Sequence, residues 1–327
     1  MAIARWIVMW TVASVTASTS VLAQTPPSYG LDFVTIGAPG NRATIPSEVP
    51  LTPSLKIGAV DYDYRIMRTE VTVSDWLGFV NAYAPHWSGT PTNLELTGFW
   101  INLTPNGYQI VPGTEGYAAN TSWRMAARYT NWLHNGRVNE PWAFENGAYD
   151  SSTFTTTPQG YHNDQEAHHP DARFWLPTID EWVKGMHYDP DRYGPGQEGY
   201  WSSQAGMQGY LISGYPWEGG QTSAMIKGLF GDFPVGLYPD VQSPWGLLEG
   251  SGGGSEWSET IWDPIFRTRM VDGSHAGGTI SWDRLDLISS ADPRDITWGF
   301  RVASQVPTPT VLASLVLFAA AWPRRRA

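Results

Sequence analysis

The chain of 327 residues contains no cysteine. This absence excludes disulfide bonds, zinc–thiolate sites, cysteine-bound iron–sulfur clusters and cysteine nucleophiles. Stability must therefore come from the burial of apolar surface, and a chain of this length can bury a large core. Eighteen tryptophans, 15 tyrosines and 11 phenylalanines supply large side chains for that core.

Basic residues are also scarce, with 20 Lys and Arg against 31 Asp and Glu and a net charge of −11. Segments 1–23 and 306–327 hold four of the arginines and no acidic residue. The part between them therefore has 16 basic and 31 acidic residues, a net charge of −15. Because nucleic-acid binding needs a basic surface, we expect no nucleic-acid partner.

The apolar runs near the two ends fall short of the roughly 20 residues that span a bilayer. Residues 1–23 combine a short basic start, a mostly apolar stretch and a Val-Leu-Ala end. This pattern is typical of a secretory signal peptide, and a membrane anchor is the alternative. Residues 24–32 read as a linker rich in Pro, Ser and Tyr.

Residues 306–327 combine a Pro-Thr-Pro motif, an apolar run over 311–322 and three arginines before the last residue. This layout resembles a PEP-CTERM-type sorting signal, although Thr308 stands where that signal has Glu. The resemblance implies a membrane sorting enzyme as a partner and a place at the cell surface, or outside the cell, of a Gram-negative-type bacterium. A frayed hydrophobic tail is the alternative, but it does not explain the arginines.

Capping residues and apolar spacing predict three helices. Thr72 or Ser74 can cap the first, because a hydroxyl there accepts an otherwise unpaired backbone N–H. The second covers residues 122–134 and stops before an Asn-Gly pair. Thr178 and Glu181 form a capping box at the start of the third.

Short strands are expected at residues 33–37, 58–68, 99–103 and 108–111, each bounded by turn residues. Thirty-four glycines and 25 prolines punctuate the remainder. No repeat of 20–50 residues is visible. The sequence therefore predicts one loop-rich α+β domain over residues 33–304.

Short motifs rich in Trp, Gly and Pro follow one another along this domain. They occupy residues 64–72, 122–133, 176–182, 215–217, 234–236, 245–257, 272–274 and 299–301. Their order and spacing resemble the formylglycine-generating-enzyme family of sulfatase-modifying factors. The resemblance implies a C-type-lectin-like fold with little regular secondary structure.

Most of the matching residues are expected to build the scaffold. A large indole fills space between irregular loops and needs only one buried hydrogen-bond partner. We therefore expect Trp123, Trp132, Trp182 and Trp217 in the core. Arg301 should make a buried, fork-like pairing with a carboxylate or with carbonyl groups.

The family's oxidation chemistry uses a copper-binding cysteine pair, and an ungapped match places its two positions at Gly277 and Trp282. Since the chain has no cysteine, formylglycine formation is rejected and no copper is expected. Trp257 and Ser274 match positions of the family's substrate groove. With His275 and Trp282 they form the predicted ligand-binding set, although packing is an alternative role for them.

The resemblance also implies calcium, which prefers carboxylate and carbonyl oxygens. Glu256 keeps the carboxylate of the family's calcium-binding turn, and Gly253 and Gly254 can offer carbonyls. The family's Asn ligand is replaced by Gly253. We therefore predict at most one calcium ion at these three residues.

Two functions remain open. The first is a non-catalytic binding or structural protein of the cell envelope or extracellular matrix, which recognises a glycan or a matrix protein. The second is an enzyme with non-cysteine chemistry, such as the iron-dependent oxidation of the family's sulfoxide-synthase branch, through a subset of His162, His168, His169 and His187. The missing cysteines and the sorting segment favour the first.

Overall fold

A computed structural model describes residues 26–226 and 233–306 of the chain. The predicted signal peptide and, apart from Val306, the predicted sorting segment lie outside these residues. Residues Pro26–Val306 form one compact unit. No helix within the described ranges is long and apolar enough to cross a membrane.

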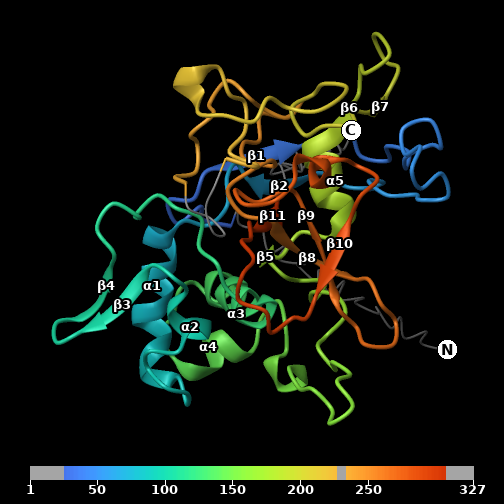
Figure 1. Ribbon diagram of the computed structural model, residues 1–327. Helices are drawn as coiled ribbons and strands as arrows, with labels where there is room; N and C mark the ends of the chain where they lie inside the picture. Colours follow the sequence, from blue (N-terminus) through green and yellow to red (C-terminus); the bar gives the residue numbers. More distant parts are fainter. Residues whose placement is uncertain (1–25, 227–232, 307–327) are drawn as a thin grey trace, which may run out of the picture. The chain divides into compact units, whose positions relative to one another are not determined.

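Five α-helices and several 3₁₀ turns are present among the described residues, and Figure 1 shows that loops connect them over most of the chain. The α-helices are α1 (Val73–Tyr83), α2 (Leu94–Thr97), α3 (Trp123–His134), α4 (Pro141–Glu145) and α5 (Ile179–His187). The 3₁₀ turns are η1 (Ala84–His86), η2 (Ser151–Thr153), η3 (Pro216–Glu218) and η4 (Ile280–Asp283). Helices α1 to α4 gather together, whereas α5 contacts β8 and β9.

The strands are short and pair antiparallel in four small sheets. One sheet has the order β1-β2-β11-β5 and another the order β10-β9-β8, while β3-β4 and β6-β7 are two-stranded. The bounds are β1 (Phe33–Ile36), β2 (Tyr64–Met67), β3 (Ile101–Thr104), β4 (Gly107–Ile110), β5 (Phe174–Trp175), β6 (Tyr188–Asp189), β7 (Gly199–Tyr200), β8 (Glu256–Ile261), β9 (Arg269–Asp272), β10 (Ser289–Ala291) and β11 (Ala303–Gln305). These elements confirm the loop-rich α+β prediction.

Two helix starts have the predicted caps, at Thr72 and Thr178, and the structure adds a third cap at Ser122. The Thr72 side chain accepts a hydrogen bond from the Asp75 backbone N–H, and the Asp75 carboxylate accepts one from the Thr72 backbone N–H. Thr72 therefore caps α1, and Ser74 does not. Thr178 and Glu181 form the same reciprocal capping box at α5. Ser122 caps α3 by accepting from the Met125 N–H at 3.2 Å.

One predicted strand is too long. Residues 58–68 pair only over Tyr64–Met67, where β2 lies between β1 and β11. Gly58 has a positive φ of 88°, and a side chain there would meet the Tyr200 ring at 2.5 Å. This left-handed backbone interrupts extended structure at Gly58, and a bend at Asp61 and Tyr62 precedes the start of β2 at Tyr64.

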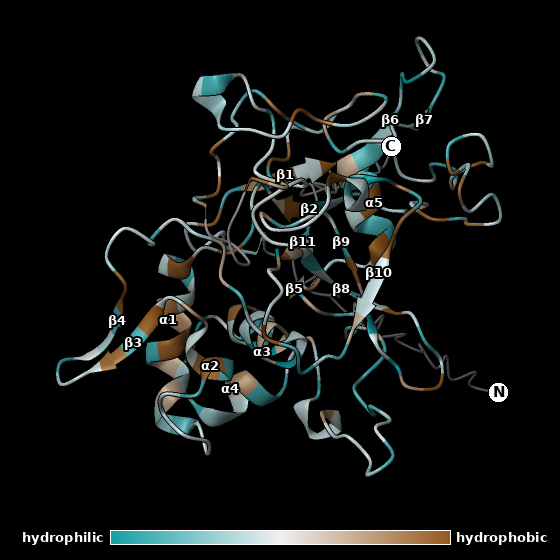
Figure 2. Cartoon of the chain, viewed as in Figure 1, coloured by the Kyte–Doolittle hydropathy of each residue, from teal (hydrophilic) through white to brown (hydrophobic). Residues whose placement is uncertain are grey.

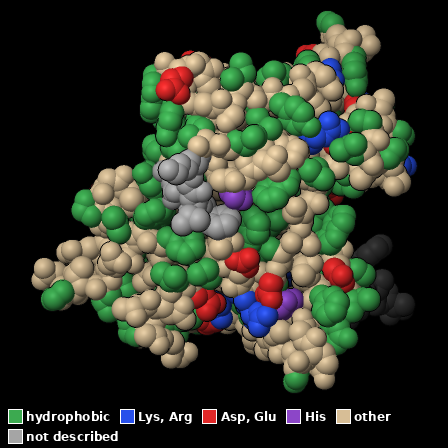
Figure 3. Space-filling view, in the orientation of Figure 1, with side chains coloured by type: hydrophobic (Ala, Val, Ile, Leu, Met, Phe, Trp, Pro, Cys, Tyr) green, Lys and Arg blue, Asp and Glu red, His purple; other side chains and the backbone are tan. Residues whose placement is uncertain are grey.

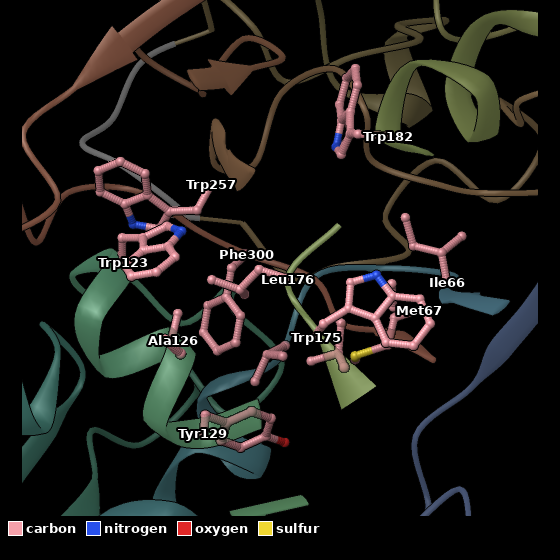
Figure 4. Packing of buried hydrophobic residues seen from close by; sticks show 14 of the residues in the cluster. Ile66, Met67, Trp123, Ala126, Tyr129, Trp175, Leu176, Trp182, Trp257 and Phe300 are labelled. Atoms are coloured by element: carbon pink, nitrogen blue, oxygen red, sulfur yellow. The ribbon is translucent and has the colours of Figure 1, made fainter. Parts of the chain in front are cut away.

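The core is aromatic, and Figure 2 shows hydrophobic residues concentrated in the helices and several central strands. Trp123, Trp132 and Trp182 are buried, as predicted. Figure 4 shows Phe300 between helix α3 and Leu176. The prediction for Trp217 is wrong, because this indole is 73% exposed in the η3 turn.

Arg301 confirms the predicted buried fork. Its Nε and Nη2 atoms each lie 2.5 Å from an oxygen of Glu256, and its guanidinium also donates to the carbonyls of Met67, Arg68 and Leu248. Although burial alone would lower it, the Glu256 charge raises the pKa of Arg301. This side chain therefore joins β2, β8 and the segment before β11.

Candidate functional site

The four residues of the predicted ligand-binding set divide into two pairs. Trp257 is fully buried on β8, and its indole N–H donates to the Thr121 carbonyl at 2.8 Å. Ser274 is equally buried, and its hydroxyl accepts the Gly252 N–H at 3.1 Å. Both residues therefore hold loops together, and neither presents a surface to solvent.

His275 and Trp282 form the second pair, and both are half-buried. Their rings lie 5.5 Å apart at an angle of 57°. Burial lowers the pKa of His275, so this side chain is neutral at pH 7. Trp282 belongs to η4 and forms one wall of a pocket, which makes it the member of the predicted set that can meet a ligand.

This pocket lies at the end of β9 and has further walls from Ser289 and Trp298. Its floor contains Ser255 and Asp272. About 30 Å³ is free for the centre of a water molecule, whereas one water needs roughly 10–15 Å³. The pocket therefore has room for a small chemical group of a larger ligand.

Asp272 is 3% exposed and is bound on one side only. Its Oδ1 accepts the Gly273 N–H at 2.7 Å, but Oδ2 has no hydrogen-bond partner among the described residues. Burial raises the pKa of Asp272 well above its usual value, and the neighbouring Asp283 and Glu256 raise it further. The Ser255 hydroxyl likewise has no partner among these residues.

The pocket therefore offers an acidic group and a hydroxyl to an incoming ligand. A buried polar atom without a partner costs free energy that a ligand's hydrogen bond can recover. From the sequence, Asp272 was placed in a family motif without a predicted role, and Ser255 was not predicted as a site residue. A carboxylate at the end of a buried strand is the signal that could have indicated Asp272.

A second layer of hydrogen bonds supports the pocket. Asp283 accepts the Ser251 hydroxyl at 2.5 Å and the Ser274 N–H at 3.0 Å. Burial raises the pKa of Asp283 to about 6, although these hydrogen bonds act to lower it. Gly273 packs against the backbone of Gly250, and a Cβ atom at residue 273 would lie only 2.7 Å from the Gly250 carbonyl oxygen. The chain must approach itself closely behind the pocket.

The model of the sulfatase-modifying factor enzyme 1-like domain matches residues 36–306. The chain belongs to this family. No curated protein matches it in sequence.

The solved structures that this family member resembles share little of its sequence. Treponema denticola variable protein 1 is 15% identical, with a TM-score of 0.51, and the match covers 84% of this chain and 95% of that protein. CarF is 18% identical, with a TM-score of 0.49 and coverage of 84% and 98%. PvdO from Pseudomonas aeruginosa is 15% identical, with a TM-score of 0.46 and coverage of 84% and 94%. At these identities the variable protein supports the fold alone.

The copper chemistry associated with the sulfatase-modifying factors uses thiolate ligands, which this sequence does not contain. Since the sequence contains no cysteine, no thiolate is available to hold copper(I). One of the two matched positions is Trp282, and the other is Gly277. Of these two residues, Trp282 lines the pocket.

Glu256, the predicted carboxylate ligand for calcium, lies next to Arg301. Both oxygens of Glu256 are bound by this guanidinium, and one also accepts the Trp182 indole N–H at 3.1 Å. The Gly253 carbonyl accepts the Ala276 N–H at 3.2 Å. Glu256 is thus already neutralised, and this geometry does not fit calcium at that carboxylate. Calcium binding itself stays a prediction for metal analysis to test.

The predicted histidines have separate surroundings. His168 bonds to Glu259 through Nδ1 at 2.7 Å and stacks on Trp175, while His162 bonds to Thr156. His187 is fully buried against the Trp201 carbonyl. Across residues 26–226 and 233–306, no three His, Cys, Asp or Glu side chains converge on a metal position. No described cluster therefore favours the iron-dependent alternative.

Charged groups are also sparse on the face shown in Figure 3. Acidic, basic and histidine side chains meet near its lower centre, and hydrophobic or neutral polar groups cover most of the remainder. Recognition over such a surface depends on shape, aromatic contact and hydrogen bonds.

Proposed function

We propose that this family member is an exported, non-catalytic binding protein of the cell envelope or extracellular matrix. The observation that carries the proposal is the pocket in which Asp272 and Ser255 have polar atoms without partners among the described residues, beside Trp282. A family pocket that has lost its reacting thiols but offers unsatisfied polar atoms is suited to holding a ligand. The ligand is a glycan or another matrix protein.

The pocket's chemistry limits which group of the ligand enters it. Asp272 accepts a hydrogen bond when ionised, and its raised pKa also allows the protonated form to donate one. The neighbouring indoles provide apolar walls. A hydroxyl or ammonium group on a short apolar stem satisfies both requirements, and the free space suits a group of this size.

Export and sorting form a separate part of the proposal. The basic-apolar start of residues 1–23 supports a signal peptide, and the tail over 306–327 supports recognition by a membrane sorting enzyme. Mass spectrometry of the protein from its native cell should find a new N-terminus near Gln24 and the loss of the arginine cluster. An intact chain in the cytoplasm would contradict this part and leave the pocket proposal standing.

The binding test compares two charge-neutralising variants. We expect Asp272→Asn to weaken binding of a glycan or matrix protein by at least ten-fold in titration calorimetry, because the pocket loses its acceptor charge. Asp240→Asn is the matched control, since Asp240 is exposed and does not line the pocket. Equal affinities of the two variants, with both folded by circular dichroism, would contradict the proposal.

The Trp282 wall gives an independent test of the same pocket. We expect Trp282→Ala to weaken binding by roughly five-fold or more, because an aromatic contact contributes about 1 kcal/mol beyond area burial. Trp142→Ala is the control, as Trp142 is exposed on α4. Oxygen consumption by the iron-loaded protein, abolished by substitution of two histidines, would instead support the enzymatic alternative.

A further inference from the structure

The loop over residues 211–222 carries an aromatic pair that the core does not use. The rings of Tyr215 and Trp217 stack 4.6 Å apart at an angle of only 10°. Tyr215 is half-buried, and Phe233 meets it nearly edge-on at 6.0 Å. Trp217 rests on this support but is 73% exposed, so one large face of the indole is open to solvent.

The loop holds this indole in a fixed place. Its two arms cross at Gly214 and Gly220, where a Cβ atom on Gly220 would lie 1.8 Å from the Gly214 carbonyl oxygen. The Gly220 N–H donates to the Tyr215 carbonyl at 2.9 Å, and the Gly214 N–H donates to the Thr222 carbonyl at 3.1 Å. The 3₁₀ turn η3, visible as the small yellow helix in Figure 1, presents Trp217 at the tip.

A small pocket lies at the base of the same loop. Leu211 and Gln221 line it from the loop, and Gln204, Tyr238 and Glu249 line it from the body of the protein. The Tyr238 hydroxyl donates to the carbonyl of Gly214 at 3.0 Å, which ties the pocket to the loop crossing. About 10 Å³ is free for the centre of a water molecule, so one hydroxyl-sized group fits.

Gln204 makes this pocket chemically demanding. The side chain is 3% exposed, and neither its amide nitrogen nor its amide oxygen has a hydrogen-bond partner among the described residues. A buried amide without partners is costly, and it offers a donor and an acceptor side by side. A hydroxyl group, which both donates and accepts, is the smallest organic group that satisfies both atoms.

We propose that loop 211–222 and the pocket at its base form a carbohydrate-binding site. A neutral hexose ring stacks on the open face of Trp217, and one of its hydroxyl groups enters the pocket beside Gln204. The negative π face of the indole attracts the C–H groups of the sugar ring, which the ring oxygens polarise. Sugar rings combine such an apolar face with hydroxyl groups at the rim.

The charge of the loop selects a neutral sugar over an anionic surface. Residues 211–226 include the exposed Glu218 and no Lys or Arg. Within these described residues, an anionic lipid headgroup or a sulfated sugar would meet an acidic side chain and no basic one. No residue lines both this pocket and the one containing Asp272, so the inference stands apart from the binding role proposed above.

Titration of the full chain with cellohexaose, chitohexaose and mannohexaose tests the inference. We expect at least one hexasaccharide to bind and Trp217→Ala to weaken that binding by ten-fold or more. Trp262→Ala is the matched control, because Trp262 is 52% exposed elsewhere on the surface. Trp217→Tyr should retain part of the affinity, since it keeps an aromatic face.

Gln204→Met separates the pocket from the stacking contact. This change keeps the side-chain length while removing both unpartnered polar atoms, so we expect a several-fold loss of affinity with a melting temperature that does not fall. The inference is overturned if none of the three sugars binds, or if Trp217→Ala binds as tightly as the control. Loss of sugar binding on Asp272→Asn alone would overturn it as well, as would a Trp217-dependent affinity for phosphatidylcholine vesicles or for a second copy of the chain in place of sugar.

Discussion

Glu256 and Asp272 lie directly opposite each other on β8 and β9, yet their carboxylates have different surroundings. Glu256 receives two hydrogen bonds from Arg301 and one from Trp182. Asp272 has one oxygen without a partner among the described residues and faces a pocket. One register pair of a small sheet thus contains a fully hydrogen-bonded structural carboxylate and a carboxylate with an unpartnered oxygen beneath a pocket.

The difference teaches that burial alone does not assign a role to an acidic residue. Both side chains are nearly inaccessible, but only the bonded one contributes to holding distant segments together. Asp272 is costly to bury in its charged form, and the scaffold around it must supply the compensating stability. Substitutions at Arg301 and at Asp272 test the two carboxylates separately.

Removing Arg301 should have the largest effect. We expect Arg301→Met to lower the free energy of unfolding by about 3–5 kcal/mol, because it leaves Glu256 and the nearby Glu70 buried without a compensating charge. Urea denaturation measures the loss. Arg294→Met is the control, since the Arg294–Asp292 pair is exposed and such pairs contribute about 0–1 kcal/mol.

A variant that fails to fold would still be informative with a second change. Adding Glu256→Gln to Arg301→Met removes the stranded charge, so the double variant should recover part of the lost stability. If both Arg301→Met and Arg294→Met lowered the free energy of unfolding by the same amount, the bond between Arg301 and Glu256 would not have the structural role assigned to it.

His187 extends the comparison to a basic group. It is fully buried with Nδ1 near the Trp201 carbonyl, while Nε2 has no partner among the described residues. Burial lowers the pKa of His187 from its usual 6.5 to about 4. The fold therefore holds the neutral form, so its contribution is fully present above pH 6.5 and is lost as the pH falls towards 4.

The expected size is about 3 kcal/mol between these limits, since one pKa unit corresponds to about 1.4 kcal/mol. Urea denaturation of the wild type and His187→Gln between pH 8 and pH 4 measures it. The difference between the two proteins isolates His187 from the carboxyl groups that titrate over the same range. A constant difference across the range would contradict the expectation.

Asp272→Asn tests the carboxylate whose second oxygen has no partner among the described residues. Because the folded protein raises the pKa of Asp272, the charged form costs stability at high pH and this cost disappears as the pH falls. We expect the variant to be more stable than the wild type by about 1 kcal/mol at pH 8 and by less at pH 5. Thermal unfolding at both pH values checks this, and a destabilised variant at pH 8 would assign Asp272 a structural role.

Local sequence rules predicted the scaffold well. Thr72 and Thr178 each cap a helix as their hydroxyl groups indicated, because capping depends on a few neighbouring residues. The Arg301 fork was also predicted, since a buried guanidinium must find acceptors. The family resemblance supplied the order in which these pieces meet.

Features that depend on contacts between distant segments could not be predicted from the sequence. Trp217 was expected in the core because indoles usually pack there, but the Gly214–Gly220 crossing turns it outward. Nothing near Asp272 or Gln204 in the sequence shows that their polar atoms lack partners, because the missing partners are a property of segments far apart in the chain. The predicted ligand set therefore identified Trp282 at the pocket but not Asp272 beneath it.

Chelation should have the smallest effect and sharpens the assignment of Glu256. If Arg301 is the partner of this carboxylate, removal of calcium with EDTA leaves its bonds intact, and we expect the melting temperature to change by less than about 2 °C. A resident calcium at Glu256 would instead stabilise the fold by mass action, by about 2.7 kcal/mol at a concentration of 100 times Kd. Differential scanning calorimetry with EDTA and with excess calcium separates the two cases. If calcium raised the melting temperature and Glu256→Gln abolished that rise, Glu256 would be a calcium ligand and not a purely structural carboxylate.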